Sequence, residues 1–114
     1  MPFIDTKLNI RLSEEKETIL KERLGQAITE FPGKTEYWLM LNFSDNEKLW
    51  FRGYNHFPMA MVEVKLFGAA EEAVCSRVTR VICDLFHEVL GISPDHVYVK
   101  YEFCDRWGWN RENF

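Results

Sequence analysis

MAMVEVKLF, residues 59–67, and AEEAVCSRVTRVICDLFHEVL, residues 70–90, decide the fold of this 114-residue chain. The first stretch is rich in β-branched and aliphatic residues and predicts a strand, which Gly68 ends. The second repeats its apolar residues at intervals of three and four and predicts a long helix, which Gly91 stops. Apolar residues alternate again over 96–103 and predict another strand. The stretch from 59 to 103 is therefore expected to form a strand–helix–strand unit.

The first half of the chain predicts the same order of elements. Residues 3–10 alternate as a strand, Ser13 is the expected N-cap of a helix that continues to Phe31, and Pro32-Gly33 is expected to end it. Residues 35–43 are rich in aromatic and aliphatic side chains and predict a second strand, and 49–51 predicts a short returning strand. The tail from 104 to 114 shows no periodicity.

A shift of 58 positions superposes the two halves. Ile4, Thr6 and Leu8 fall on Val62, Val64 and Leu66, and the helix stop Gly33 falls on Gly91. The two helices and the strands that follow them superpose in the same way: Leu20, Leu24, Ile28 and Phe31 fall on Val78, Ile82, Phe86 and Val89, and Leu39, Leu41 and Phe43 on Val97, Val99 and Tyr101.

Each unit has a crossover helix, so each is expected to pair its own strands in parallel with right-handed connections. The fold class is therefore α+β: two tandem β-α-β units, forming one four-stranded mixed sheet with both helices on one face, in a single domain over 1–114. Apolar residues at nearly every position of 37–43 predict an uncovered apolar sheet face. Such a face marks an association surface, which predicts a homo-oligomer with its sheets facing inward.

Composition excludes several classes of function. The formal net charge is −4 with acidic and basic residues interspersed, so we expect no nucleic-acid partner. No apolar run reaches the length of a membrane span, and the N-terminus lacks the pattern of a secretory signal. Cys75, Cys83 and Cys104 form no metal or redox motif, and the histidines are not at metal-ligand spacing. We expect a cytoplasmic protein without metal or cofactor.

Pro2 follows the initiator methionine directly. Methionine is normally removed before a small residue, and removal would expose a secondary amine at the chain start. A desolvated α-amino group near a cation has a pKa below its usual value of roughly 8 and can act as a general base near neutral pH. The alternative is that Pro2 merely begins the first strand.

Several segments together resemble the macrophage migration inhibitory factor family of the tautomerase superfamily. They are Pro2, Gly33-Lys34, Ile92-Ser93-Pro94-Asp95-His96-Val97-Tyr98-Val99, Gly108-Trp109-Asn110 and the final Asn113-Phe114. The resemblance covers the whole chain. It implies a homotrimer whose three sheets form a central barrel, with active sites between adjacent subunits. It also implies keto–enol tautomerisation of phenylpyruvate-like acids, with dopachrome-type compounds as further substrates of some members.

The resemblance assigns roles to individual residues, each with a simpler alternative. Pro2 is the catalytic base. Lys34 binds the substrate carboxylate, or it only stabilises the C-terminal end of the helix by a favourable interaction with the helix dipole. Phe67 contacts substrate through its backbone N–H or is a core residue. Tyr98 reaches the pocket of a neighbouring subunit or is simply a half-buried strand residue.

The remaining candidates concern the rim and the charge of the pocket. Trp109 and Tyr37, with Trp107 and Phe114, line its mouth or pack in the core. Lys100 replaces a neutral amide of the human-type proteins, and it either adds a second cation to the substrate site or points to solvent. Arg106 and Arg111 replace small or neutral residues of the tail. The Cys-x-x-Cys of some members is Met59 and Val62 here, so thiol–disulfide activity is not expected.

Two functions stay open on the sequence. The first is a cofactor-independent isomerase for a small aromatic keto acid. The second is a cytokine-like trimer that binds a cell-surface receptor and retains only vestigial catalysis, because export in this family needs no signal peptide. A purely structural oligomer is a third class and predicts no ligand.

Overall fold

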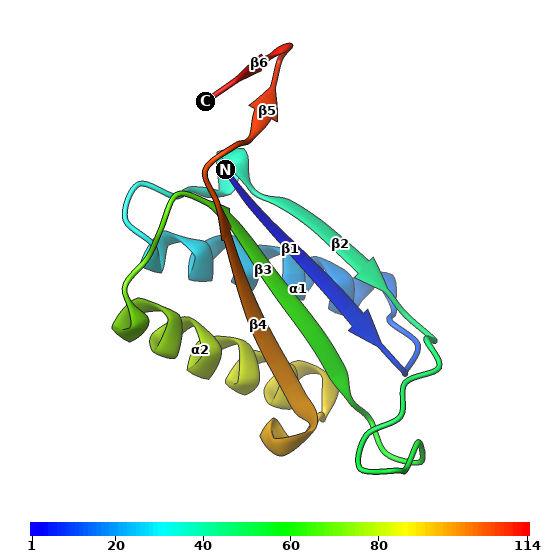
Figure 1. The fold of residues 1–114 in the computed structure, drawn as a ribbon. Coiled ribbons are helices and arrows are strands. Elements are labelled where there is room, and N and C mark those ends of the chain that lie inside the picture. The colour runs from blue at the N-terminus through cyan, green and yellow to red at the C-terminus, as the bar shows by residue number, and fades with distance from the viewer.

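The computed structural model describes residues 1–114 (Figure 1). Its strands are β1 (Pro2–Leu8), β2 (Met40–Ser44), β3 (Ala60–Phe67), β4 (Val97–Cys104), β5 (Gly108–Trp109) and β6 (Glu112–Asn113). Its α-helices are α1 (Glu14–Ala27) and α2 (Glu72–Leu90), and short 3-10 turns cover Ile28–Glu30, Glu36–Trp38 and Pro94–His96. Ser13 caps α1 by accepting a hydrogen bond from the Lys16 N–H, and Gly91 ends α2 in the left-handed conformation, as the sequence predicts.

The main sheet is mixed, with the strand order β2-β1-β3-β4. The central strands β1 and β3 are antiparallel, and each pairs in parallel with the outer strand of its own half. The register repeats with the same offset as the sequence: Ile4 pairs with Leu41, and Val62 pairs with Val99. The two tandem β-α-β units of the α+β prediction are confirmed.

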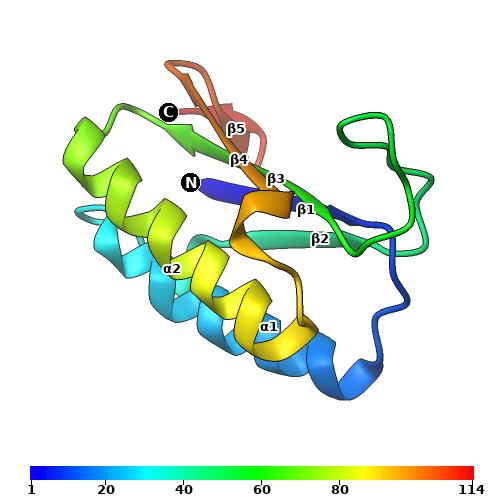
Figure 2. The ribbon, with the colours of Figure 1, turned by 90° about the horizontal axis from the view of Figure 1, so that it is seen from below.

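Both helices cover one face of this sheet (Figure 2). Residues alternate between buried and half-buried positions along β1 and β3, so every second side chain of these strands points into the helix layer. The core between the layers includes Ile4, Leu24, Val62 and Phe86, each at most 1% exposed. Neither helix combines the length and apolar composition that a membrane crossing requires.

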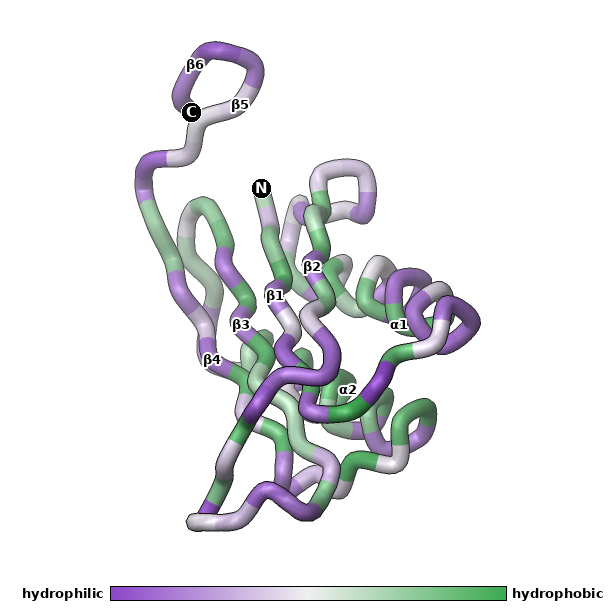
Figure 3. The backbone as a smooth tube through the Cα atoms, turned by 90° about the vertical axis from the view of Figure 1, so that its right-hand side faces the viewer, coloured by the Kyte–Doolittle hydropathy of each residue, from purple (hydrophilic) through white to green (hydrophobic).

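The open face of the sheet is charged along its middle, so the prediction of an apolar open face is wrong there, whereas Met40 and Tyr98 on the same face are 68% and 60% exposed. Lys7 lies 3.4 Å from Asp5 and 3.7 Å from Glu63, and Lys100 lies 3.1 Å from Glu102. Figure 3 shows hydrophilic and hydrophobic residues alternating along the strands. The apolar residues Leu41 and Phe43 pack against the core instead. A strand rich in apolar residues still divides them between its two faces.

Four local predictions also need correction. The strand expected over 35–43 begins only at Met40, because Glu36–Trp38 forms a 3-10 turn whose Glu36 carboxylate lies where Gly25 of α1 has no side chain. Residues 49–51 form no strand, and only Phe51 bridges to Tyr54. The first helix ends at Ala27, before Pro32-Gly33. The aperiodic tail forms the β5–β6 hairpin, which extends away from the main sheet in Figures 1 and 3.

Candidate functional site

The amino terminus is fixed at one end of the sheet. Pro2 is buried as the first residue of β1 and lies opposite Leu66 of β3. Proline lacks an N–H donor and is therefore tolerated at the start of a strand. The N–H of Phe67 donates to the Met1 carbonyl over 3.0 Å, which extends the ladder by one residue. The first residues of the chain therefore have a defined place between β2 and β3.

Lys34 lies beside this terminus. Gly33 adopts a positive φ of 78°, and the turn it allows directs the Lys34 side chain toward the end of β3. The Lys34 ammonium donates to the Phe67 carbonyl over 2.8 Å and lies 6.0 Å from the centre of the Phe67 ring. Lys34 and Phe67, both predicted site residues, are thus brought together at the amino terminus.

The amino group of Met1, which precedes Pro2, is electrostatically perturbed. Its pKa is lowered from the ordinary value of 8.0 to about 6, first because burial removes water from the charged form. The Lys34 ammonium adds to the effect by like-charge repulsion and by a hydrogen bond between the two groups. This end of the sheet therefore favours a neutral amine beside a permanent cation.

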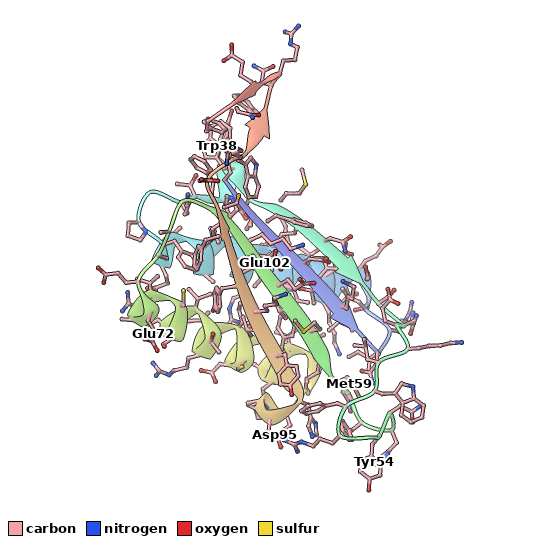
Figure 4. The ribbon with its side chains drawn as sticks, viewed as in Figure 1. Trp38, Tyr54, Met59, Glu72, Asp95 and Glu102 are labelled. Atoms are coloured by element: carbon pink, nitrogen blue, oxygen red, sulfur yellow. The ribbon has the colours of Figure 1, made fainter.

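A row of aromatic rings encloses the terminus on the solvent side. Trp38 meets Tyr37 and Trp109 edge to face, each with ring centres 4.9 Å apart. Trp109 is nearly parallel to Phe114 at 6.4 Å, and Phe114 lies 5.8 Å from Phe67. The β5–β6 hairpin and the turn before β2 therefore supply one continuous apolar wall. Figure 4 places Trp38 at this end of the molecule.

Two adjoining hollows open between these rings, and both are lined by Met1 and Trp38. The larger, of about 460 Å³, also borders Pro2, Tyr37 and Trp109, and the smaller, of about 250 Å³, borders Gly33, Phe67 and Phe114. Their size suits a small organic ligand. Trp107 also lines the larger hollow. The predicted Pro2, Lys34, Phe67, Tyr37, Trp107, Trp109 and Phe114 thus gather at one end, together with Trp38, which the sequence analysis missed.

Tyr98 and Lys100 are not at this end within one chain. Tyr98 pairs with Met61, which faces Lys7 near the far end of β1. Its side chain is 60% exposed. Lys100 lies in the middle of the open face, where it pairs with Glu102. Arg106 is exposed beside Asp105, and Arg111 lies in the hairpin turn with a φ of 72°.

The end of the sheet that holds Tyr98 has a smaller hollow, of about 160 Å³. It is lined by Leu49, Trp50, Phe51, Met59, Ala60, Met61, His96 and Tyr98. The 58-residue offset maps these residues onto lining residues of the larger hollow: Ala60 corresponds to Pro2, His96 to Trp38 and Phe51 to Trp109. The repeat in the sequence was the signal that could have identified Phe51 and His96 as counterparts of site residues.

Lys34 has no counterpart of similar chemistry at the opposite end. The offset maps it onto Ile92, which is fully buried. The position of Lys34 is therefore uncharged in the second unit. No three His, Cys, Asp or Glu side chains lie close enough together to hold a metal ion.

Comparison with known proteins gives a consistent picture. The family model described as macrophage migration inhibitory factor (MIF) matches residues 1–111. The mouse macrophage migration inhibitory factor is 27% identical over 116 residues, which cover 100% of this chain and 99% of the mouse protein.

Solved structures agree with this match. The crystal structure of MIF2 from Leishmania major is 31% identical, covers 100% of this chain and 97% of its own, and superposes with a TM-score of 0.92. A homologue of macrophage migration inhibitory factor from Prochlorococcus marinus is 26% identical with a TM-score of 0.79, over 98% of each chain.

Proposed function

Because the chain belongs to the macrophage migration inhibitory factor family, we propose that it is a cofactor-independent keto–enol tautomerase for aromatic α-keto acids such as phenylpyruvate. One observation carries the proposal. Pro2 lines an aromatic hollow, and the pKa of the Met1 amino group next to it is lowered to about 6 by burial and by the Lys34 ammonium, the same surroundings that the Pro2 amine would meet. A base that is neutral near pH 7 is what proton abstraction next to a ketone requires.

The proposed reaction begins once Met1 has been removed. Lys34 holds the substrate carboxylate by a charge-assisted hydrogen bond, and the aromatic wall receives the substrate ring. The Pro2 nitrogen takes a proton from the carbon next to the ketone. The electron pair of that C–H bond forms a carbon–carbon double bond, and the carbonyl oxygen becomes an enolate. The protonated Pro2 nitrogen returns the proton to this oxygen, which gives the enol and regenerates the base. In this proposal the backbone N–H of Phe67 also contacts the substrate, and Lys100 adds a second cation to the substrate site.

In this proposal Tyr98 acts in the site of a neighbouring subunit. Members of this family are typically homotrimers. In such a trimer we assign the exposed Tyr98 phenol to the site of the adjacent chain, where it donates a hydrogen bond to the enolate oxygen. Its distance along the sheet from Pro2 is consistent with this, since one chain does not supply both groups to one hollow.

The experiment compares the wild-type protein with Pro2→Gly, after mass spectrometry shows that both have lost Met1. Glycine keeps a primary α-amine in place of the secondary one, so it changes the base and leaves the rest of the site intact. We expect phenylpyruvate turnover, followed by ultraviolet absorbance, to fall about 10²–10⁴-fold. A Pro2→Gly protein as active as wild type removes Pro2 from the mechanism.

A receptor-binding protein is the second candidate. It is favoured by apolar side chains that remain open to solvent around the same hollow: Tyr37 is 82% exposed, and Met40 is 68% exposed. Such residues are typical of protein interfaces. Binding to a receptor ectodomain that persists in Pro2→Gly and is lost in Tyr37→Ala supports this role. If binding persists in both variants, the exposed side chains around the hollow are not the receptor-binding surface, which contradicts this role.

A further inference from the structure

The end of the sheet that holds Tyr98 contains a group of aromatic rings with no role so far. We propose that Phe51, supported by His96 and Phe57, is a positioning residue that holds the Tyr98 phenol where it donates its hydrogen bond to the enolate oxygen; this rests on the proposed function. We call Phe51, Phe57 and His96 the aromatic clasp. Phe51 meets Tyr98 edge to face, with ring centres 5.0 Å apart and planes at 74°.

The rings of the clasp contact one another, and its loop is held by hydrogen bonds. His96 stacks on Phe57 at 4.0 Å with planes 21° apart, and Phe51 meets His96 edge to face at 6.3 Å. Phe57 is itself held in place, because its carbonyl accepts a hydrogen bond of 2.8 Å from the Asn9 side-chain amide. The same amide group accepts from the Met59 N–H over 2.8 Å. The loop between β2 and β3 is therefore anchored to the end of β1.

A cation–π contact and an ion pair of Arg52 connect the clasp to the turn before β4. The Arg52 guanidinium lies over the Phe51 ring at 4.8 Å and forms an ion pair of 3.6 Å with Asp95. Asp95 belongs to the turn that leads directly into β4 and is therefore close in sequence to Tyr98. Figure 4 shows Asp95 and Tyr54 at this end, opposite Trp38. Arg52 thus connects the loop that carries Phe51 to the turn that precedes β4.

The internal repeat supports the assignment. Phe51 occupies the position that corresponds to Trp109, and His96 the position that corresponds to Trp38. At the amino-terminal end this pair of rings encloses the hollow beside Pro2. At the opposite end the corresponding pair lies against Tyr98, which takes the position of Met40. Tyr98 is 60% exposed, so few contacts other than these rings hold its side chain, and small displacements of a reacting group are costly.

The test is a double-mutant cycle between Phe51→Leu and Tyr98→Phe, with phenylpyruvate turnover as the readout. We expect Phe51→Leu to lower kcat about 10-fold with KM within about twofold of wild type, because the phenol is displaced but the carboxylate site is intact. In the Tyr98→Phe background, the same change should lower kcat less than about twofold, because no phenol remains to be displaced.

Two further variants separate positioning from folding. Phe51→Tyr keeps the ring and should retain wild-type kcat. Tyr54→Leu removes an exposed ring of the same loop that contacts only His56 among the aromatic residues, and it should change neither kcat nor KM. Thermal unfolding of all variants checks that each is folded.

Each outcome has one meaning. An inactive wild-type protein that has lost Met1 overturns the proposed function. If wild type is active, an unaffected Phe51→Leu, or an equal loss of kcat in both backgrounds, overturns the positioning role. A Tyr98→Phe protein with full activity overturns it too, because then there is no phenol for Phe51 to position.

Discussion

The first unit, β1–α1–β2, and the second, β3–α2–β4, share their strand register but differ in what fills corresponding positions. Lys34 of the first unit corresponds to the buried Ile92 of the second, and the buried hydroxyl of Thr6 corresponds to Val64. The helix α2 runs for 19 residues and buries six of them, whereas α1 runs for 14 and then tightens into a 3-10 turn. The first unit departs from regular structure where it forms the site.

The difference indicates that the two repeated units have different roles in the molecule. The second unit is the more regular one, and its helix α2 buries six residues in the core. The first unit uses the irregular stretch between α1 and β2 to present Lys34, Tyr37 and Trp38 around the chain start. Changes in the two units are therefore expected to affect different properties.

The largest effect is expected from Phe86→Ala in α2. Phe86 is fully buried, so the change leaves a large cavity and should lower the free energy of unfolding by about 3–5 kcal/mol. Urea denaturation measures this loss. The neighbouring exposed His87→Ala is the control and should stay within about 0.5 kcal/mol of wild type. Turnover per folded molecule should not change in Phe86→Ala, and a specific loss of kcat would contradict the division of tasks.

Lys34→Ala is expected to affect binding more than stability. A hydrogen bond to a charged group contributes about 1.5–3 kcal/mol, so KM for phenylpyruvate should rise roughly 10- to 100-fold. Removing the cation also raises the pKa of the amine beside it, and the acidic limb of the pH–rate profile should move to higher pH. The exposed Lys21→Ala on α1 is the matched control. An unchanged KM in Lys34→Ala would exclude Lys34 from carboxylate binding.

Thr6→Val makes the first unit resemble the second. The Thr6 hydroxyl is buried without a hydrogen-bond partner, and valine has nearly the same shape. Removing an unsatisfied polar group should raise the free energy of unfolding by about 1 kcal/mol. Thr18→Val on the exposed face of α1, where the hydroxyl donates to the Glu14 carbonyl, should give no such gain. A destabilised Thr6→Val protein would show that the hydroxyl has a partner in solution.

A pH dependence of stability is also expected in the form that retains Met1. The pKa of its amino group is about 6 in the folded chain and 8.0 when unperturbed, so the unfolded state binds more protons between these values. Stability should therefore rise as the pH increases from about 6 to 8. Urea titrations at both pH values measure this, with the N-terminally acetylated protein as control. The same rise in both proteins would assign the effect to another group.

The fold was largely predictable because it depends on patterns that are local in the sequence. Period-two alternation, two amphipathic helices, the stop at Gly91 and the 58-residue offset predict two equivalent units and their order. The failures have two causes. The stretch over 35–39 is rich enough in aromatic residues to form a strand, but the Glu36 turn packs on Gly25, a contact between distant residues that periodicity does not contain. The tail hairpin, with two residues in each strand, is too short to produce a period.

The sequence by itself determined the tandem architecture, the end of α2 at Gly91, and the candidate residues Pro2 and Lys34. Only the tertiary structure decided that Lys34 reaches the Phe67 carbonyl beside the chain start, that Trp38 joins the aromatic wall, and that Tyr98 lies at the opposite end against Phe51. The tertiary structure also decided that the charged residues Lys7, Asp5 and Lys100 lie on the face of the sheet that the helices leave open. Alternation tells which residues share a face of a strand, but the packing of the helices decides which face is covered and which residues meet across it.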